Sequence, residues 1–259
     1  MGYLTNKKGV VMGVANDHSI AWGIAKKLSE EGAELCFTYQ GDSLLRRVKP
    51  LAESINNDFL IECDVLKKES IENTFKKIKE KWETIDFVLH SIAFSDKEEL
   101  KGKYIKTSRE NFTQTMLISC FSFTEIANEA HKIMPNGGSM LTLTYDGSQK
   151  FIPNYNVMGV AKAALESSVR YIAADLGDAG IRVNALSAGP MKTLAMAGIS
   201  GGKDMMRWSE KNSLMLRNIS LDDVGKSGLY LLSDLSSGVT GEVHYVDCGY
   251  NKVGVPREI

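Results

Sequence analysis

Cysteine is scarce in this chain of 259 residues, and nothing in its placement points to a metal centre or a disulfide framework. No CxxC pair occurs, and the cysteines stand mostly inside apolar runs, which is typical of buried, reduced thiols in a cytosolic protein. The histidines lack HExxH spacing and a neighbouring carboxylate cluster, so we expect no metal site. The cysteines are Cys36, Cys63, Cys120 and Cys248, and the histidines are His18, His90, His131 and His244.

The chain also lacks an excess of positive or negative charge, and it has no long apolar runs. The chain balances 31 Lys and Arg against 32 Asp and Glu, for a formal net charge of −1. No global positive field therefore attracts nucleic acid or anionic lipid. No run of about 18 apolar residues could span a membrane, and the N-terminal segment MGYLTNKKGV lacks the apolar core of a secretory signal. We expect a cytoplasmic protein with no nucleic-acid or membrane partner.

Short apolar runs alternate with segments of helical periodicity from one end of the chain to the other. Seven such runs are continuously hydrophobic, which is typical of strands in a sheet covered on both faces. A repeated strand–helix–strand order indicates parallel pairing through right-handed crossovers. We predict an α/β fold with a single doubly wound, Rossmann-like domain over residues 1–259, in which helices cover both faces of a seven-stranded parallel sheet. The predicted strands are residues 9–14, 33–39, 59–63, 86–92, 139–145, 182–188 and 242–248.

Apolar residues at steps of three and four predict three long helices between these strands. The first covers residues 71–82, and the third covers 157–176, where Gly177 and Gly180 close it. The second covers residues 112–134, and the apolar face of this helix begins at Phe112.

Residues 190–212 break the alternation after the sixth strand. The segment is rich in Met, Gly and Ser. Irregular insertions of this length in compact domains are usually functional or disordered. We interpret the segment as a substrate lid, with a mobile surface loop as the alternative.

The loop after the first strand, GVANDHSIAWGIAKKL, lacks the GxGxxG of a Rossmann fingerprint. It still meets the physical needs of a dinucleotide loop. Gly13 lets the chain leave the strand tightly, and Ser19 can cap a helix whose N–H groups point toward a pyrophosphate. Ala21 and Gly23 let that helix lie close to the sheet. Because a glycine turn before a capped helix is common, the loop alone does not decide for nucleotide binding.

The second and third strands end in residues that suit an adenosine. Gln40 could hydrogen-bond the ribose, and no arginine stands immediately beside it to hold a 2′-phosphate. This favours NADH, although Arg46 and Arg47, a turn or two later, keep NADPH open. Asp64 could accept a hydrogen bond from the adenine amino group while Val65 packs on the ring, but a turn or cap role is a common alternative for such an aspartate.

The fourth strand ends in HSIAF, which starts at His90. Ile92 and Ala93 are apolar or small and could let the cofactor pass over the sheet. We expect His90 to be a hydrogen-bonded histidine behind the site rather than a catalytic group.

The fifth strand ends at Tyr145, and the segment IPNYNVMGVAK follows. It holds Tyr155 and Lys162 seven positions apart, so on a helix they share a face and are separated by a rise of roughly 10 Å. The four-residue interval of most short-chain dehydrogenases would place the tyrosine at position 158, which is Met158 here. The Tyr155 hydroxyl should therefore reach a different atom of the substrate.

Taken together, these segments resemble the bacterial NADH-dependent enoyl-acyl carrier protein reductases, a divergent branch of the short-chain dehydrogenase/reductase family. The resemblance spans essentially the whole chain, and the spaced tyrosine–lysine block with the downstream AGPMKTLA is typical of this branch. The matching segments are Gly13 with the Ser19-Ile20-Ala21-x-Gly23 turn, FTYQ, CDV, HSIAF, LTLTY, IPNYNVMGVAK, RVNALSAGPMKTLA and TGEVHYVD.

The resemblance implies reduction of trans-2-enoyl thioesters on acyl carrier protein by hydride transfer from NADH, the last step of type II fatty-acid elongation. It implies that Tyr155 hydrogen-bonds the thioester oxygen, and that Lys162 holds the nicotinamide ribose and lowers the tyrosine pKa. Tyr145 would relay a proton or shape the pocket, and Ser95 would contact substrate through its backbone. The family is homotetrameric. The implied cofactor-binding residues are Gly13, Ser19, Ile20, Gln40, Asp64, Val65, Ile92, Lys162, Met191, Lys192, Thr193, Leu194 and Ala195.

Two other functions stay open on the residues alone. A short-chain dehydrogenase acting on a ketone or alcohol is disfavoured by Met158, which occupies the usual tyrosine position. A non-catalytic NAD-binding protein is disfavoured because it would not need Tyr145, Tyr155 and Lys162.

Overall fold

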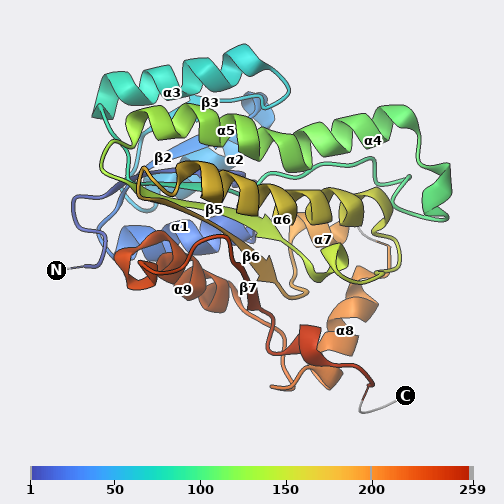
Figure 1. The fold of residues 1–259 in the computed structure, drawn as a ribbon. Helices are drawn as coiled ribbons and strands as arrows, with labels where there is room; N and C mark the ends of the chain where they lie inside the picture. Colours follow the sequence, from blue (N-terminus) through green and yellow to red (C-terminus); the bar gives the residue numbers. More distant parts are fainter. Residues whose placement is uncertain (1, 199, 257–259) are drawn as a thin grey trace.

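The computed structural model describes residues 2–198 and 200–256, which form a seven-stranded parallel sheet with helices on both faces (Figure 1). The strand order is β3-β2-β1-β4-β5-β6-β7, so the winding reverses between β1 and β4. The predicted doubly wound α/β fold is confirmed. The strands are β1 (Lys8–Met12), β2 (Glu34–Tyr39), β3 (Leu60–Glu62), β4 (Phe87–His90), β5 (Gly138–Thr144), β6 (Ile181–Ala188) and β7 (Val243–Val246).

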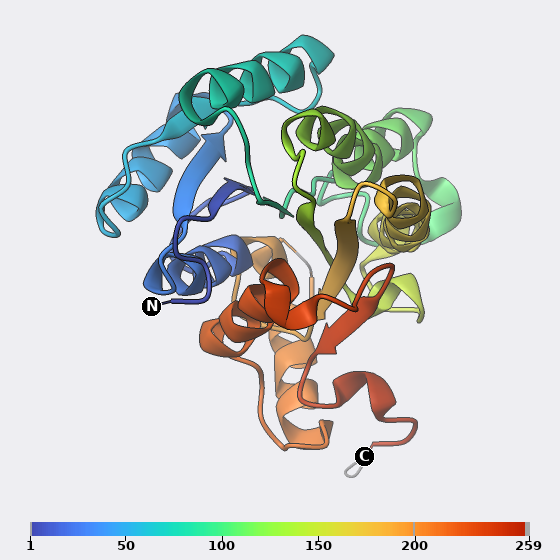
Figure 2. The same ribbon diagram turned by 60° about the vertical axis from the view of Figure 1, so that its left-hand side comes forward.

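Two hydrophobic cores lie on opposite faces of the sheet, because alternate residues of each strand point to opposite sides. On β1, Val10 and Met12 pack with α3, α5 and α6, whereas Val11 packs with α1, α2 and α9. Figure 2 shows these two helical layers flanking the strands. The helices of the layers are α1 (Ile20–Glu30), α2 (Gly41–Glu53), α3 (Lys68–Trp82), α5 (Ser122–Ala130), α6 (Asn156–Leu176) and α9 (Leu221–Leu232).

The second predicted helix is interrupted. It consists of α4 (Arg109–Met116), a π-helical segment (Leu117–Phe121) and α5. A π turn holds more residues than an α turn, so it rotates the buried face relative to an uninterrupted helical pattern. In α4 the buried residues are therefore Asn111 and Thr115, whereas Phe112 is 39% exposed. The prediction that Phe112 faces the core was wrong.

Residues 190–212 are more regular than their composition predicts. They contain two helices, α7 (Leu194–Ala197) and α8 (Gly202–Asn212). A Cβ at Gly202 would lie 2.8 Å from the carbonyl oxygen of Met196, so the glycine allows α8 to begin against α7. The prediction of an irregular insertion was wrong, because this glycine serves helix packing rather than a loop.

The register of the strands brings their carboxyl ends to one edge. Met12 on β1 is level with Thr38 on β2 and with His90 on β4. The segments that follow these residues, which carry Gly13, Gln40 and Ile92 of the predicted cofactor-binding residues, therefore leave the sheet together. In the described part of the chain, no helix is both long and apolar enough to cross a membrane.

Candidate active site

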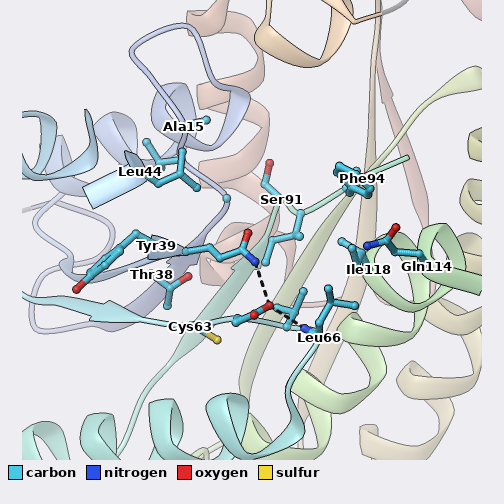
Figure 3. Close-up of a pocket in the computed structure, with 17 residues that line it drawn as sticks. Ala15, Thr38, Tyr39, Leu44, Cys63, Leu66, Ser91, Phe94, Gln114 and Ile118 are labelled. Carbon is cyan, nitrogen blue, oxygen red and sulfur yellow. Dashed lines mark hydrogen bonds between the residues drawn. The ribbon is translucent and has the colours of Figure 1, made fainter. Parts of the chain in front are cut away.

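A cavity of about 300 Å³ opens at the carboxyl ends of β1 to β4 (Figure 3). Five predicted cofactor-binding residues line it: Gly13, Gln40, Asp64, Val65 and Ile92. The cavity lies beside the reversal of winding between β1 and β4, where doubly wound proteins bind their ligands.

Gln40 and Asp64 contact each other at the wall of this cavity. The Gln40 Nε2 donates to Asp64 Oδ1 at 3.1 Å, and the Leu66 backbone N–H donates to the same oxygen at 3.1 Å (Figure 3). The sequence predicted separate roles for these two side chains, and the structure joins them in one hydrogen-bonded unit. Neither Arg46 nor Arg47 lines the cavity, and both are exposed on α2.

The cavity also has walls that the sequence analysis missed. Phe94 follows β4, and Gln114 and Ile118 come from α4 and the π-helical segment. Gln114 and Ile118 are distant in sequence from the strand ends, and only the packing of the helix over the sheet brings them there. The remaining missed residues are Val14, Ala15, Thr38, Tyr39, Leu44, Cys63, Leu66 and Ser91.

The loop between β1 and α1 depends on a glycine and a serine. Gly13 has φ +97°, and a Cβ there would lie 2.0 Å from the Ser91 carbonyl oxygen, so only glycine fits. Ser19 occupies the N-cap position, but its Oγ accepts from the N–H groups of Ala15 and Asn16, each at 3.0 Å. Ser19 is thus the N-cap residue, as predicted, but its hydroxyl fixes the loop and does not accept from the first turn of α1. Ile20 begins α1 directly after it.

Two buried tyrosines meet near the carboxyl end of β5. Tyr145 follows β5 and Tyr155 is the N-cap residue of α6; their ring centroids are 5.3 Å apart at an interplanar angle of 73°. They pack in one apolar cluster with Leu100, Val157 and Met158, and Met205 of α8 packs against it. The sequence predicted that Tyr145 and Tyr155 share a site, and the structure brings them together.

Lys162 of α6 is also buried. Its Nζ donates to the Leu143 carbonyl oxygen on β5 at 2.8 Å. Burial lowers the pKa of Lys162 to about 8, while Cys120 and Glu166 oppose that change. Burial, followed by the Glu166 charge, raises the pKa of Tyr155. The predicted lowering of the tyrosine pKa is therefore wrong, because burial and the Glu166 charge both raise it.

The segment after β7 supplies a third tyrosine. Burial raises the pKa of Tyr145 and the neighbouring Tyr250 raises it further, yet the Tyr145 hydroxyl has no partner of ordinary hydrogen-bond geometry among the described residues. Tyr250 in turn contacts Trp208 of α8, with ring centroids 5.2 Å apart. The sequence analysis missed Tyr250, which no motif marks.

His90 has the role that its sequence context predicts. Its Nδ1 pairs with Thr142 Oγ1 and its Nε2 with Ser122 Oγ, both at 2.9 Å. Burial, helped by the Lys162 charge, lowers the pKa of His90 to about 3, so the ring is neutral at physiological pH. His90 is a satisfied histidine behind the site, as expected.

The remaining predicted residues lie at the same edge but do not line the cavity. Ser95 pairs with the Asn111 side chain at 3.3 Å, so its hydroxyl is engaged. The segment from Met191 to Ala195 follows β6 and enters α7. Met191 is buried, Lys192 and Leu194 are exposed, Thr193 is half-buried, and the side chain of Ala195 lies outside the described part of the structure.

The doubly wound sheet, the cavity at its winding reversal and the buried Tyr155 and Lys162 define the class of protein. They are the features of a dinucleotide-dependent reductase of the short-chain dehydrogenase type. In the described part of the chain, no group of three or more His, Cys, Asp or Glu side chains is placed to hold a metal ion.

Comparison with known proteins places the chain more narrowly. The model of a family described as enoyl-(acyl carrier protein) reductase matches residues 13–251. The enoyl-(acyl-carrier-protein) reductase (NADH) 2 of Rhizobium meliloti is 62% identical over 255 residues, covering 98% of this chain and 95% of that protein. The crystal structure of FabI from Candidatus Liberibacter asiaticus is 60% identical with a TM-score of 0.97, covering 99% of both chains. That of the Anaplasma phagocytophilum reductase in complex with NAD is 55% identical with a TM-score of 0.96, covering 98% of this chain and 97% of that one. The chain belongs to the enoyl-acyl carrier protein reductase family.

Proposed function

We propose that the protein reduces the carbon–carbon double bond of trans-2-enoyl thioesters on acyl carrier protein with NADH, the last step of type II fatty-acid elongation. The observation that carries this proposal is the convergence of buried Tyr145, Tyr155 and Lys162 near the carboxyl end of β5 in a member of the enoyl-acyl carrier protein reductase family. The reductases of Rhizobium meliloti and Anaplasma phagocytophilum are named for NADH or contain NAD.

The residues present suit NADH along its whole length. The cavity beside Gln40, Asp64 and Val65 is at the small end of ligand pockets, which suits the adenosine half. Gly13, Ser19 and Ile20 lead into the N-terminus of α1, where a pyrophosphate is favourable. In this proposal, Lys162, Ile92 and the segment 191–195 would contact the nicotinamide half. Exposed Arg46 and Arg47 stand away from the cavity, which supports NADH over NADPH.

The roles of the site residues follow from their protonation. NADH, when bound, supplies the hydride to the β-carbon of the substrate. Tyr155, whose pKa is raised by burial, stays protonated and donates a hydrogen bond to the thioester oxygen as negative charge collects there. Lys162 holds the ribose hydroxyls of the nicotinamide half through its ammonium group. Tyr145 packs edge-on against Tyr155 and shapes the pocket, and Ser95 offers its backbone to the substrate.

The wider context of the enzyme is part of the proposal. We treat residues 1–259 as one catalytic domain and residues 190–212 as its lid, because Met205 of α8 packs against the Tyr145–Tyr155 cluster. A homotetramer is supported by apolar side chains exposed on α6 and on the π-helical segment beside it. The four free, buried cysteines suit the reducing cytosol.

A single assay separates this function from its alternatives. With a crotonyl or longer enoyl thioester, NADH absorbance should fall with time, and Tyr155→Phe should lower kcat by roughly 10²–10³-fold. Lys162→Ala should weaken NADH binding as well as turnover. Turnover of ketones alone would support a ketone reductase, and saturable NADH binding without any turnover would support a non-catalytic binder.

A further inference from the structure

Glu166 is a buried carboxylate inside the catalytic region. It lies on α6, four residues after Lys162, so the two side chains share a helix face. Glu166 is 2% exposed. Among the described residues no Lys, Arg or His forms an ion pair with it at contact distance. A buried charge is strongly unfavourable unless it is hydrogen-bonded, so its partners are informative.

All three partners of Glu166 come from the segment that carries Tyr145. Oε1 accepts from Thr144 Oγ1 at 2.6 Å and from Ser148 Oγ at 2.5 Å, and Oε2 accepts from Gln149 Nε2 at 2.6 Å. Thr144 directly precedes Tyr145, and the other two donors end the turn that follows it. The carboxylate therefore ties both ends of the Tyr145 turn to α6.

Close packing shows that this turn has little freedom to move. A Cβ at Gly147 would lie 2.5 Å from the Tyr155 ring, and a Cβ at Gly159 on α6 would lie 2.7 Å from the Gly147 carbonyl oxygen. The turn is thus seated between Tyr155 and the first turns of α6. Release of the Glu166 tether would alter the surroundings of both tyrosines.

The charge of Glu166 acts on the same groups. It opposes the lowering of the Lys162 pKa that burial causes, and it adds to the raised pKa of Tyr155. The other titratable groups around Lys162 are Cys120 from the π-helical segment and His90 from β4, and His90 is neutral. Those around Glu166 also include Tyr245 from β7 and Asp146, which pairs with Lys150 at 3.1 Å. Glu166 is the anion among these groups that acts on both Lys162 and Tyr155: it opposes the effect of burial on the Lys162 pKa and reinforces the effect of burial on the Tyr155 pKa.

We propose that Glu166 is a positioning residue of the reductase: its three hydrogen bonds fix the Tyr145 turn against α6, and its negative charge stabilises the ammonium form of Lys162. The proposal rests on the roles proposed above for Tyr145, Tyr155 and Lys162. A carboxylate that served the fold alone would hold the turn but would leave the titration of the cofactor site unchanged.

The effect of the Glu166 charge on Lys162 is tested by measuring NADH affinity as a function of pH. This measurement does not require the enzyme to turn over. Affinity in the wild type should fall as pH rises through the titration of Lys162, since only the ammonium form holds the ribose. Glu166→Gln keeps the size of the side chain but loses the charge, so the midpoint should move down by about one pH unit. Asp175→Asn removes an exposed carboxylate from the same helix and should leave the midpoint unchanged. Equal midpoints for the wild type and Glu166→Gln would overturn the electrostatic role.

The tether is tested by kinetics at a fixed pH below the midpoint. Ser148→Ala removes one donor and keeps the charge, so kcat with a crotonyl thioester should fall several-fold while the NADH midpoint stays in place. Glu166→Asp retains the charge on a shorter side chain, so it should also lower kcat several-fold and leave the NADH midpoint in place. This variant tests the tether even if Glu166→Gln does not fold. Unchanged kcat in both variants would overturn the tethering role. A wild type that does not turn over enoyl thioesters would instead refute the proposed function, because the binding titration stands independently.

Discussion

Lys162 combines burial with a charge, and that combination has a consequence for stability. The ordinary pKa of lysine is near 10.5, and in the folded protein it is lowered to about 8. Between pH 8 and pH 10.5 the unfolded chain therefore holds a proton that the folded protein has released, so stability rises with pH in this window. Below pH 8 Lys162 is protonated in both the folded and the unfolded state, so the folded protein bears the full free-energy cost of burying its charge. The difference of about 2.5 pH units corresponds to about 3 kcal/mol.

We therefore expect Lys162→Met to raise the melting temperature at pH 7 by several degrees while abolishing turnover. The gain should shrink as pH rises toward 10.5, which thermal unfolding at several pH values would measure. Lys79→Met, at an exposed position of α3, is the matched control and should change little. If the Lys162→Met variant were less stable than the wild type at pH 7, the buried ammonium group would not destabilise the folded protein.

At the same scale, the sequence predicted the identity of the reactive residues better than their contacts. The seven-residue interval in IPNYNVMGVAK was enough to place Tyr155 and Lys162 on one helix. It could not show that the ammonium group would bind the Leu143 carbonyl oxygen, since that partner stands on another element. Glu166 was missed for the same reason: its three donors come from the turn after β5, and their approach depends on packing.

At the scale of elements, the sequence predicted where the strands lie, but it did not predict the buried face of every helix. Every strand was found because parallel strands are apolar throughout, but a π-helical segment shifted the buried face of α4 from Phe112 to Asn111. The Met, Gly and Ser content of residues 190–212 suggested an irregular segment where α8 forms. The apolar pattern of a segment predicts which of its residues are buried within one helix or strand. A π-helical insertion or a contact between two helices depends on the surrounding fold, so that pattern does not predict it.

The α8 helix should act as a substrate lid through aromatic contact. Trp208 meets Tyr250 edge-on, at an interplanar angle of 84°, and Tyr250 lies beside Tyr145, so α8 is connected to the pocket. Trp208→Ala should raise the KM for a long enoyl thioester roughly two- to tenfold, since an aromatic pair contributes about 0.5–1.5 kcal/mol beyond burial. NADH affinity should change little. Glu210→Gln, an exposed change on α8, is the control, and an unchanged KM in Trp208→Ala would argue against a lid.

At the scale of the whole molecule, several apolar side chains on neighbouring helices remain exposed after the two cores are formed. Phe121 is 51% exposed and Tyr171 is 73% exposed, on the π-helical segment and on α6, which lie side by side (Figure 1). Phe112 and Val160 add 39% and 37% exposure on α4 and α6. Exposed apolar side chains gathered on neighbouring helices mark an association surface, and a formal net charge of −1 gives little repulsion between copies.

This face should hold the proposed tetramer together, and a charge placed on it should divide the assembly. The wild type should sediment as a tetramer at micromolar concentration, because a stable interface buries roughly 800 Å² on each partner and this face supplies apolar area for it. Tyr171→Asp with Phe121→Asp should shift the protein to smaller species, since two carboxylates would lose water at each interface. Ile105→Asp, at a side chain 85% exposed outside these helices, should leave the tetramer intact. If the double variant sedimented like the wild type, the subunits would have to meet through another surface, and the exposure of Phe121 and Tyr171 would need a different explanation.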